Sequence, residues 1–388
     1  MNPPANNAVL SSPWVEISLD NVVHNVNQIR GALPPSVGIM AVVKDNAYGC
    51  GGVMVSRVLE SHNVGHFAVA RTVEARALRE AGIRSPILVL GPATAEEVRW
   101  GAGSRIGFSL NDMADVSAWQ SLGCPVRFHL NVDTGMGRLG ILPRETAAFA
   151  EAVGGRDTLL FEGMYTHLAN ADSADAGSIS QQLARFRTSL AALADKGLRP
   201  GIIHYGNSAA VMRYPLEECT LVRPGIALYG CKPNPAREFS LDLKPVMSLK
   251  ARVIKMKKVP AGTAISYGST YVTVSETVIA TIALGYGQGL PRQLSNRGVV
   301  LIRGRRYGIA GRVTMDFIMV DAGANTDMSV GDEVVAIGSQ ETHCIHPDDV
   351  AVLCDTISYE IMCSINPRID RCFILDGKPV HQETGRTF

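Results

Sequence analysis

The sequence predicts an α/β protein, with an N-terminal (β/α)8 TIM barrel over residues 1–240 and a mostly antiparallel C-terminal β domain over residues 241–388. Three observations predict this class. The chain has 388 residues, which is more than one ordinary hydrophobic core accommodates. Residues 1–240 alternate short apolar runs with segments of helical period. Residues 241–388 contain successive apolar runs separated by Gly and Pro, as in a β domain.

Eight apolar runs are the expected barrel strands. Between them, apolar residues recur at three- and four-residue spacing, and the same period before the first strand predicts a further helix over residues 19–33. Eight strands with seven helical crossovers match a (β/α)8 barrel. A doubly wound open sheet is the rival, because periodicity alone does not show closure. The expected strands are residues 39–44, 66–70, 86–90, 105–110, 126–133, 161–167, 201–207 and 225–230.

In the second domain, strands are expected within residues 245–259, 277–287, 298–311, 317–323 and 332–338. One helix is expected to begin near Pro347, with paired carboxylates in its first turn.

Composition excludes several classes of function. A net charge of +1 and a pI of about 7.6 give no broad field for nucleic acid or an anionic membrane. The eight cysteines form no C-x-x-C pair, which predicts reduced thiols rather than a disulfide framework. Residues 1–13 lack the pattern of a secretory signal, and no apolar run is long enough to span a bilayer. We therefore expect a soluble, cytoplasmic protein.

In a parallel barrel, ligands bind at the carboxyl ends of the strands. A lysine, an imidazole, two arginines, hydroxyls and backbone amides are expected to converge there. This inventory suits a phosphorylated, planar cofactor held through an imine. The residues at these ends are Lys44, Tyr48, Arg138, His167, Asn170, Asp172, His204, Asn207, Ser208 and Tyr229, and the approach to the eighth strand adds Arg223, followed by Gly225 and Ile226.

Lys44 has two interpretations on local grounds. It could be a solvated residue that ends a strand, or a Schiff-base lysine whose stem is buried behind the apolar run of residues 39–43. The glycines at 49, 51 and 52 suggest positive φ or a close backbone approach nearby. Arg138 and Arg223 could likewise form surface ion pairs, although Arg223 lies between apolar residues and a Pro-Gly pair. His167 alone could be a hydrogen-bonded core residue.

Residues 342–349 superficially resemble a metal cluster, because they contain His343, Cys344, His346, Asp348 and Asp349. No second half of a site with zinc spacing follows. We expect an exposed loop with a helix N-cap, and no metal.

Nine motifs in order along the chain resemble those of the alanine racemases, enzymes of fold type III that use pyridoxal 5′-phosphate (PLP). The motifs are AVVKDNAYGCG, VDTGMGRLG, THLANAD, HYGNSAA, RPGIALYG, ISYGSTY, GYGQGLPR, GRVTMDF and TISYEIMCSINPRIDR. The resemblance implies racemisation of alanine by a homodimer with shared active sites. Lys44 is then the lysine that binds PLP and removes the proton from the D-enantiomer. Tyr267 is the second catalytic base, which reaches the other subunit's site and acts on the L-enantiomer.

The same resemblance implies the other roles. Arg223 faces the pyridine nitrogen, His204 bonds to that arginine, and His167 lies beside the ring. Because a guanidinium is a poor proton donor, the ring nitrogen stays unprotonated and side reactions such as transamination are suppressed. The phosphate is surrounded by Tyr48, Ser208, Gly225, Ile226 and Tyr359, and Asn207 is counted among the cofactor-binding residues. The substrate side is assigned to Arg138, Met315 and Asp316, with Tyr286 and Tyr359 at the entrance.

Several positions depart from the family pattern. Many members have a carbamylated lysine where this chain has Asn131, so no carbamate is expected. Other departures are Asp45, Cys50, Gln288, Thr314 and Phe317. These departures remove no catalytic group, but they leave the substrate range open.

Three alternatives are weighed against an alanine racemase. A serine racemase, or one of broader specificity, could share the framework. A PLP decarboxylase of the same fold type would need a different partner for the ring nitrogen than Arg223. The single-domain PLP-binding homeostasis proteins are not enzymes, and they lack the second domain that carries Tyr267.

Overall fold

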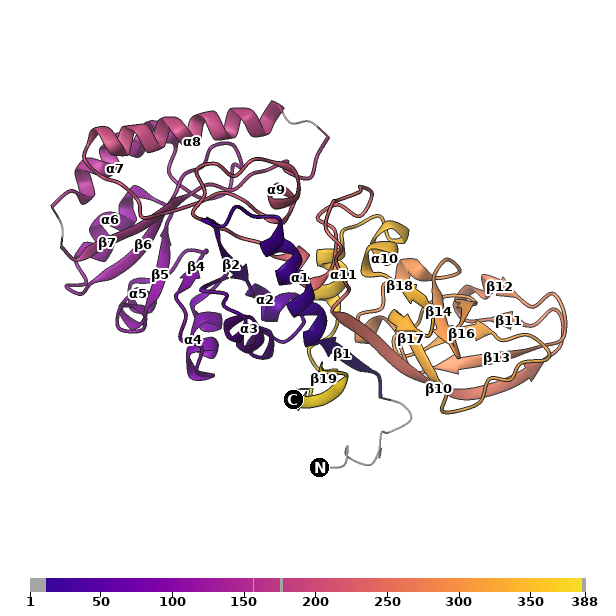
Figure 1. Cartoon of the computed structure of the whole chain (residues 1–388). Helices are drawn as coiled ribbons and strands as arrows, with labels where there is room; N and C mark the ends of the chain where they lie inside the picture. The colour runs from indigo at the N-terminus through magenta and orange to yellow at the C-terminus, as the bar shows by residue number, and fades with distance from the viewer. Residues whose placement is uncertain (1–11, 156, 175–176, 386–388) are drawn as a thin grey trace.

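The computed structural model describes residues 12–155, 157–174 and 177–385, and forms two domains (Figure 1). The interpretation of the N-terminus as lacking a signal falls mostly on residues 1–11, outside the described residues. Within the described ranges, no helix is both long and apolar enough to cross a membrane.

The first domain is a barrel of parallel strands in the order β8-β7-β6-β5-β4-β3-β2-β9. The barrel is closed between β8 and β9 by a parallel bridge from Asn207 to Arg223 and by the bond from Thr220 N to Ile203 O, 2.8 Å. The predicted barrel is confirmed, and the open-sheet rival is wrong. The strands are β2 Gly38–Val42, β3 His66–Val69, β4 Ile87–Val89, β5 Ile106–Leu110, β6 Val126–Asn131, β7 Leu159–Tyr165, β8 Ile202–His204 and β9 Leu221–Val222.

The eighth strand differs from the prediction. The strand is Leu221–Val222, whereas the predicted run 225–230 contains the 3-10 helix η2, Ile226–Tyr229. Pro224 has no N–H to donate, and the N–H groups of Gly225 and Ala227 donate to Ser208 Oγ instead of to a neighbouring strand. The eighth barrel strand, β9, therefore ends at Val222, just before Arg223.

Helices cover the outside of the barrel, and short side chains cap several of them. Ser18 Oγ accepts from Asn21 N at the start of α1, and Asn207 Oδ1 accepts from Ala210 N at the start of α9. The helices are α1 Leu19–Gly31, α3 Gly52–Ser61, α4 Thr72–Glu80, α5 Ala95–Ala102, α6 Met113–Gln120, α7 Thr146–Val153, α8 Gly177–Asp195 and α9 Ser208–Arg213.

The second domain is mostly antiparallel, as predicted. Its long strand β10, Met247–Val259, pairs antiparallel with β1 (Trp14–Ser18), β13 (Thr277–Ile282) and β17 (Glu333–Gln340). Two short helices, α10 Pro347–Leu353 and α11 Ser358–Ser364, lie on the side of this domain that faces the barrel (Figure 1). The remaining strands are β11 Ala264–Ile265, β12 Tyr271–Val272, β13 Thr277–Ile282, β14 Val299–Ile302, β15 Arg305–Gly308, β16 Ile318–Asp321, β17 Glu333–Gln340, β18 His343–Ile345, β19 Asp370–Leu375 and β20 Lys378–Glu383.

Strand β1, Trp14–Ser18, precedes the barrel but belongs to the sheet of the second domain. It pairs antiparallel with β10 and parallel with β19. The chain therefore crosses between the domains twice, once after β1 and once before β10 (Figure 1). The limits 1–240 and 241–388 stay a prediction.

Candidate active site

Lys44 follows β2 and begins α2, Lys44–Tyr48, which is a left-handed turn. Asp45, Asn46, Ala47 and Tyr48 all have φ between 52° and 54°. Non-glycine residues rarely adopt this conformation, which costs about 1–2 kcal/mol per residue. The turn holds because Ala47 N donates to Val43 O at 2.9 Å, and Gly52 N donates to Asn46 Oδ1 at 2.7 Å. Lys44 is thereby left half-buried at the carboxyl end of the strand.

The glycines after Lys44 let the second domain approach the turn. Gly51 has φ +88°, and a Cβ there would lie 2.4 Å from Cζ of Phe373. Arg371 Nε donates to Gly49 O at 2.8 Å. The expectation of positive φ and close approach is therefore confirmed. Asp45, one of the departures, forms an ion pair of 3.2 Å with Arg71.

A cavity of about 440 Å³ lies at the carboxyl ends of the strands. It brings together most of the predicted site, along with Asp172 and Tyr165, while Asn170 is exposed outside it. The predicted residues that line it are Lys44, Tyr48, Arg138, His167, Asn207, Ser208, Arg223, Gly225, Ile226 and Tyr359. Tyr229 lies behind Tyr48 and donates to Val42 O at 2.8 Å.

Arg223 is buried, and its guanidinium is held by acceptors at the carboxyl ends of β7 and β8. Nη1 donates to Nδ1 of His204 at 2.8 Å, and Nη2 donates to Thr166 O at 3.0 Å. The guanidinium lies over the ring of Tyr165, with Cζ 5.0 Å from its centroid. Burial lowers the pKa of Arg223 to about 10, so the group remains a cation at neutral pH.

Two histidines border this arginine and stay neutral. Burial first, and then the charge of Arg223, lowers the pKa of His167 to about 3. The same two causes hold the pKa of the fully buried His204 well below its usual range. Nδ1 of His167 lies 3.4 Å from Nη2 of Arg223 and accepts from it. Both imidazoles therefore serve as acceptors for the guanidinium.

Hydroxyl groups gather at the other end of the cavity. A Cβ on Gly225 would lie 2.4 Å from Tyr48 Oη, so only glycine leaves room for this phenol. The ring centroids of Tyr48 and Tyr359 are 5.8 Å apart, and burial raises the pKa of both phenols. Ser208 Oγ accepts from Gly225 N at 2.9 Å, which leaves its O–H free to donate. This cluster of O–H donors fits a phosphate, and the amine of Lys44 fits the carbonyl carbon of PLP.

Arg138 is exposed at the cavity, on the glycine-rich loop that follows β6. Asp133 Oδ1 shapes this loop by accepting from the N–H groups of Gly135, Met136 and Gly137 at 2.9–3.1 Å. Asn131 is buried and donates to Asn111 Oδ1 at 2.9 Å, and among the described residues it forms no hydrogen bond with Arg138.

His204 does not line the cavity but is hydrogen-bonded to Arg223, which does, and four predicted site residues of the second domain do not line the cavity either. Tyr267 is 72% exposed in the 3-10 turn between β11 and β12, at the end of the second domain far from the barrel (Figure 1). Met315, Asp316 and Tyr286 are also exposed. They form one surface, since Tyr286 N donates to Thr314 O at 3.0 Å and Gln288 Nε2 donates to Asp316 Oδ1 at 3.3 Å.

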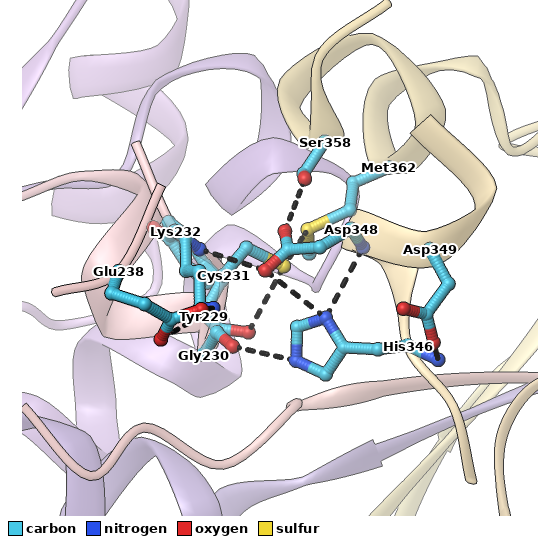
Figure 2. A network of polar contacts seen from close by, with 10 residues as sticks. All are labelled: Tyr229, Gly230, Cys231, Lys232, Glu238, His346, Asp348, Asp349, Ser358 and Met362. Carbon is cyan, nitrogen blue, oxygen red and sulfur yellow. Dashed lines mark hydrogen bonds and ion pairs between the residues drawn. The ribbon is translucent and has the colours of Figure 1, made fainter. Parts of the chain in front are cut away.

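The metal-like segment ties the two domains together. Figure 2 shows the His346 ring between the Gly230 carbonyl and Asp348, with Nε2 3.0 Å from Gly230 O and Nδ1 accepting from Asp348 N at 3.1 Å. The predicted N-cap of α10 is confirmed. The expected loop is wrong for His343–Ile345, which forms β18 against β17. The expected exposure is wrong for Asp348, which is buried and whose carboxylate accepts from Ser358 Oγ and Lys232 N.

One group of possible metal ligands occurs in the described part of the chain, and the same network contains it. Ligand atoms of Cys231, His346 and Asp348 lie within 4.8 Å of one another. Both ring nitrogens of His346 are already hydrogen-bonded, and burial raises the pKa of the Cys231 thiol. The group anchors α11 through contacts of Asp348 with Ser358 and of Cys231 with Met362 (Figure 2). Tyr359 follows Ser358 in this helix.

Sequence reasoning missed Tyr165 and His129. Tyr165 stacks on His204 with ring centroids 4.8 Å apart, and Ser109 Oγ lies 2.8 Å from its phenol oxygen. His129 lies 2.8 Å from His204. The signal was the two-residue period of a strand, because Tyr165 precedes His167 by two positions and His129 precedes Asn131 by two.

Comparison with known proteins supplies the family. The model of the alanine racemase N-terminal domain matches residues 17–233, and that of the alanine racemase C-terminal domain matches residues 246–373. The chain belongs to the alanine racemase family. Membership makes it an isomerase and confirms the resemblance drawn from the motifs. Because both models match, the chain also has the second domain that single-domain PLP proteins lack.

Individual relatives are similar to this chain over nearly its whole length. An alanine racemase of Carboxydothermus hydrogenoformans is 42% identical, covering 93% of this chain and 99% of the relative. An alanine racemase of Desulfovibrio desulfuricans is 39% identical, with coverage of 93% and 98%. The crystal structure of the Bacillus anthracis alanine racemase with bound L-Ala-P matches with a TM-score of 0.89 at 37% identity, covering 96% of this chain and 97% of that one.

Proposed function

We propose that this chain is a PLP-dependent, two-base racemase that interconverts L- and D-alanine, and that it acts as a homodimer with shared sites. The observation that carries the proposal is that Lys44 and Arg223 line one cavity while Tyr267 is exposed on the other domain. One chain supplies one base to its own cavity. A second copy then supplies the other.

The residues of the cavity match the parts of PLP. Lys44 Nζ would carry the covalent link, and Arg223 would face the pyridine nitrogen. The hydroxyls of Tyr48, Ser208 and Tyr359 would bind the phosphate, with Gly225 and Ile226 beside them and Asn207 holding the start of α9. The chemistry that bound PLP supplies is delocalisation of the electron pair left when a Cα proton departs.

Two bases on opposite faces account for racemisation. Lys44 Nζ removes the Cα proton of D-alanine on one face, while Tyr267 Oη of the second copy delivers a proton on the other; the reverse reaction exchanges these roles. Arg138 orients the substrate carboxylate, and Met315 and Asp316 approach from the second copy. Arg223 remains a cation and gives no proton to the ring, which limits transamination.

The second copy is expected to cover an exposed apolar surface on the C-terminal domain. Tyr267, Tyr286, Met315 and Phe317 are all exposed. Met315 O accepts from Gly287 N at 2.8 Å, which places Met315 next to Tyr286. We expect the protein in the cytoplasm, and its eight cysteines, all free thiols, support this.

A chiral assay with alanine and serine tests the function. We expect racemisation of alanine in the unsubstituted protein, and its loss in both Lys44→Ala and Tyr267→Phe. Normal racemisation of alanine by either variant would show that the assigned base is wrong. Faster turnover of serine than of alanine would instead favour the serine alternative.

Mixing the two inactive variants tests the shared site. If the bases come from different subunits, co-expressed Lys44→Ala and Tyr267→Phe chains form hybrid dimers with one intact site, and activity returns to about a quarter of the unsubstituted level. If each site takes both bases from one chain, mixing restores nothing. Sedimentation of each preparation verifies that dimers are present.

A further inference from the structure

A chain of hydrogen bonds runs from Arg223 into the core of the barrel. Arg223 Nη1 lies 2.8 Å from His204 Nδ1, and His204 Nε2 lies 2.8 Å from His129 Nδ1. The two imidazoles meet edge to face, with centroids 5.0 Å apart and an interplanar angle of 67°. His204 and His129 are both buried. Arg223 lines the cavity that also contains Lys44. His129 does not line this cavity, and its hydrogen bond to His204 connects it to Arg223.

Arg223 determines which atom donates and which accepts in each hydrogen bond of this series. A guanidinium has donors and no acceptor, so Nδ1 of His204 must accept. A neutral imidazole has one donor and one acceptor, so His204 carries its proton on Nε2 and donates it to His129 Nδ1. The proton of His129 then lies on its own Nε2, which forms no hydrogen bond to another described residue.

The backbone is shaped to admit the His129 ring. The pairing of β6 with β7 shifts by one residue between Phe128 and His129, so that Glu162 is bulged and His129 faces Gly163. A Cβ on Gly163 would lie 2.5 Å from Nδ1 of His129. The bulge and the glycine together place the acceptor nitrogen next to His204.

We propose that His129 is a positioning residue for Arg223. By accepting the Nε2 proton of His204, it fixes the tautomer whose Nδ1 lone pair faces the guanidinium, and so holds Arg223 where it meets the cofactor's ring nitrogen. This inference rests on the proposed function for its consequence on PLP, but the tautomers themselves do not depend on it.

The first test reads the protons directly in the full-length protein as purified. Long-range proton–nitrogen spectra of protein labelled with ¹⁵N-histidine distinguish an Nδ1–H from an Nε2–H ring. His129→Asn and His204→Gln identify the two signals. We expect both rings to be neutral with the proton on Nε2 near neutral pH. A proton on Nδ1 of His204 would overturn the proposal.

The second test uses three variants. His129→Leu removes the acceptor, whereas His129→Asn keeps an acceptor oxygen near the place of Nδ1. His66→Leu is the matched control, because His66 and His129 line the same second cavity, of about 380 Å³, and His66 forms no hydrogen bond with His204 among the described residues. The readouts are the His204 tautomer and the equilibrium dissociation constant of PLP, which is measured by visible absorbance. A thermal melt verifies that each variant is folded.

We expect His129→Leu to mix the His204 tautomers and to raise the dissociation constant of PLP about tenfold, the usual effect of losing one buried hydrogen bond. His129→Asn should restore both readouts, and His66→Leu should change neither. An unchanged tautomer in His129→Leu, or an effect of His129→Asn as large as that of His129→Leu, would refute the proposal. If the unsubstituted protein bound no PLP, the proposed function would fail, while the tautomers would still decide this inference.

Discussion

Gly225 is the residue whose lack of a side chain most directly shapes the cavity. Its missing Cβ leaves space for the phenol of Tyr48, whose Oη would otherwise lie 2.4 Å from the added carbon. The same residue donates its N–H to Ser208 Oγ, so the two hydroxyls stay together.

Gly225→Ala should therefore displace Tyr48. Overpacking of this kind costs about 1–3 kcal/mol of unfolding free energy. If Tyr48 binds the phosphate as proposed, Gly225→Ala should also weaken PLP binding, because the Tyr48 hydroxyl moves. Urea unfolding and visible absorbance measure the two effects. Gly65→Ala is the control, since no atom lies within 4 Å of its added Cβ. Equal stability of the two variants would contradict this role of Gly225.

Single residues at strand ends could be predicted from the sequence. Lys44 and His167 end predicted strands, and the barrel brings these ends together, whereas Arg223 was expected before the eighth strand and instead directly follows β9. Motif resemblance, rather than periodicity, supplied Tyr267 and Met315. Their exposure explains why, because an exposed side chain is not part of the buried apolar pattern that periodicity reveals.

The left-handed turn α2 is the element that presents Lys44. Four consecutive non-glycine residues with positive φ persist only where surrounding contacts hold them. The contacts come from both domains, since Asp45 pairs with Arg71 of the barrel and Gly49 O accepts from Arg371.

Gly51→Ala should destabilise this element strongly. Positive φ costs an alanine about 1–2 kcal/mol, and the clash with Phe373 adds about 1–3 kcal/mol of overpacking. Gly82→Ala separates the two causes, because Gly82 has φ +90° and no atom within 4 Å of its added Cβ. Urea unfolding should show a larger loss for Gly51→Ala. If the losses were equal, contact with Phe373 would not matter.

The elements that the sequence mispredicted were set by tertiary contacts. The run 225–230 is apolar enough for a strand, but Ser208 Oγ binds its N–H groups and turns it into η2. Helix α11 was not predicted either, because its seven residues show less than two periods of helical patterning. The bounds of the long strand β10 agreed closely with the expected range 245–259.

At the scale of the whole molecule, buried neutral histidines make stability depend on pH. The pKa of His129 falls from 6.5 to about 3 on folding, with burial as the main cause. Between these values the unfolded chain binds the extra proton, so unfolding free energy decreases as pH falls below 6.5.

His129 alone should reduce the free energy of unfolding by about 1.4 kcal/mol for each pH unit below its unfolded pKa. His204, whose pKa is also lowered, should add to this loss. Urea unfolding at several values between neutral and mildly acidic pH measures the slope. His129→Asn should have a shallower slope. A slope unchanged by that substitution would show that His129 does not titrate as the structure implies.

The presence of two domains could be predicted from the change in apolar pattern along the chain, but strand β1 could not be predicted. Its five residues carry too short a pattern, and their partners in β10 and β19 lie more than 200 residues later in the chain. Sequence patterning reports local period, whereas pairing at this separation is decided by the assembled sheet.

The placement of β1 in the distant sheet has a mechanical consequence. Two backbone connections join the domains, one from β1 to α1 and one that leads into β10. Because β1 and β10 are paired neighbours in one sheet, these two tethers lie close together. A single tether permits rotation about many axes, whereas a pair restricts it to a hinge passing through both. During synthesis, β1 is made before the barrel, whereas its parallel neighbour β19 is made after it, so the sheet that holds the two tethers together is complete only once β19 has been made.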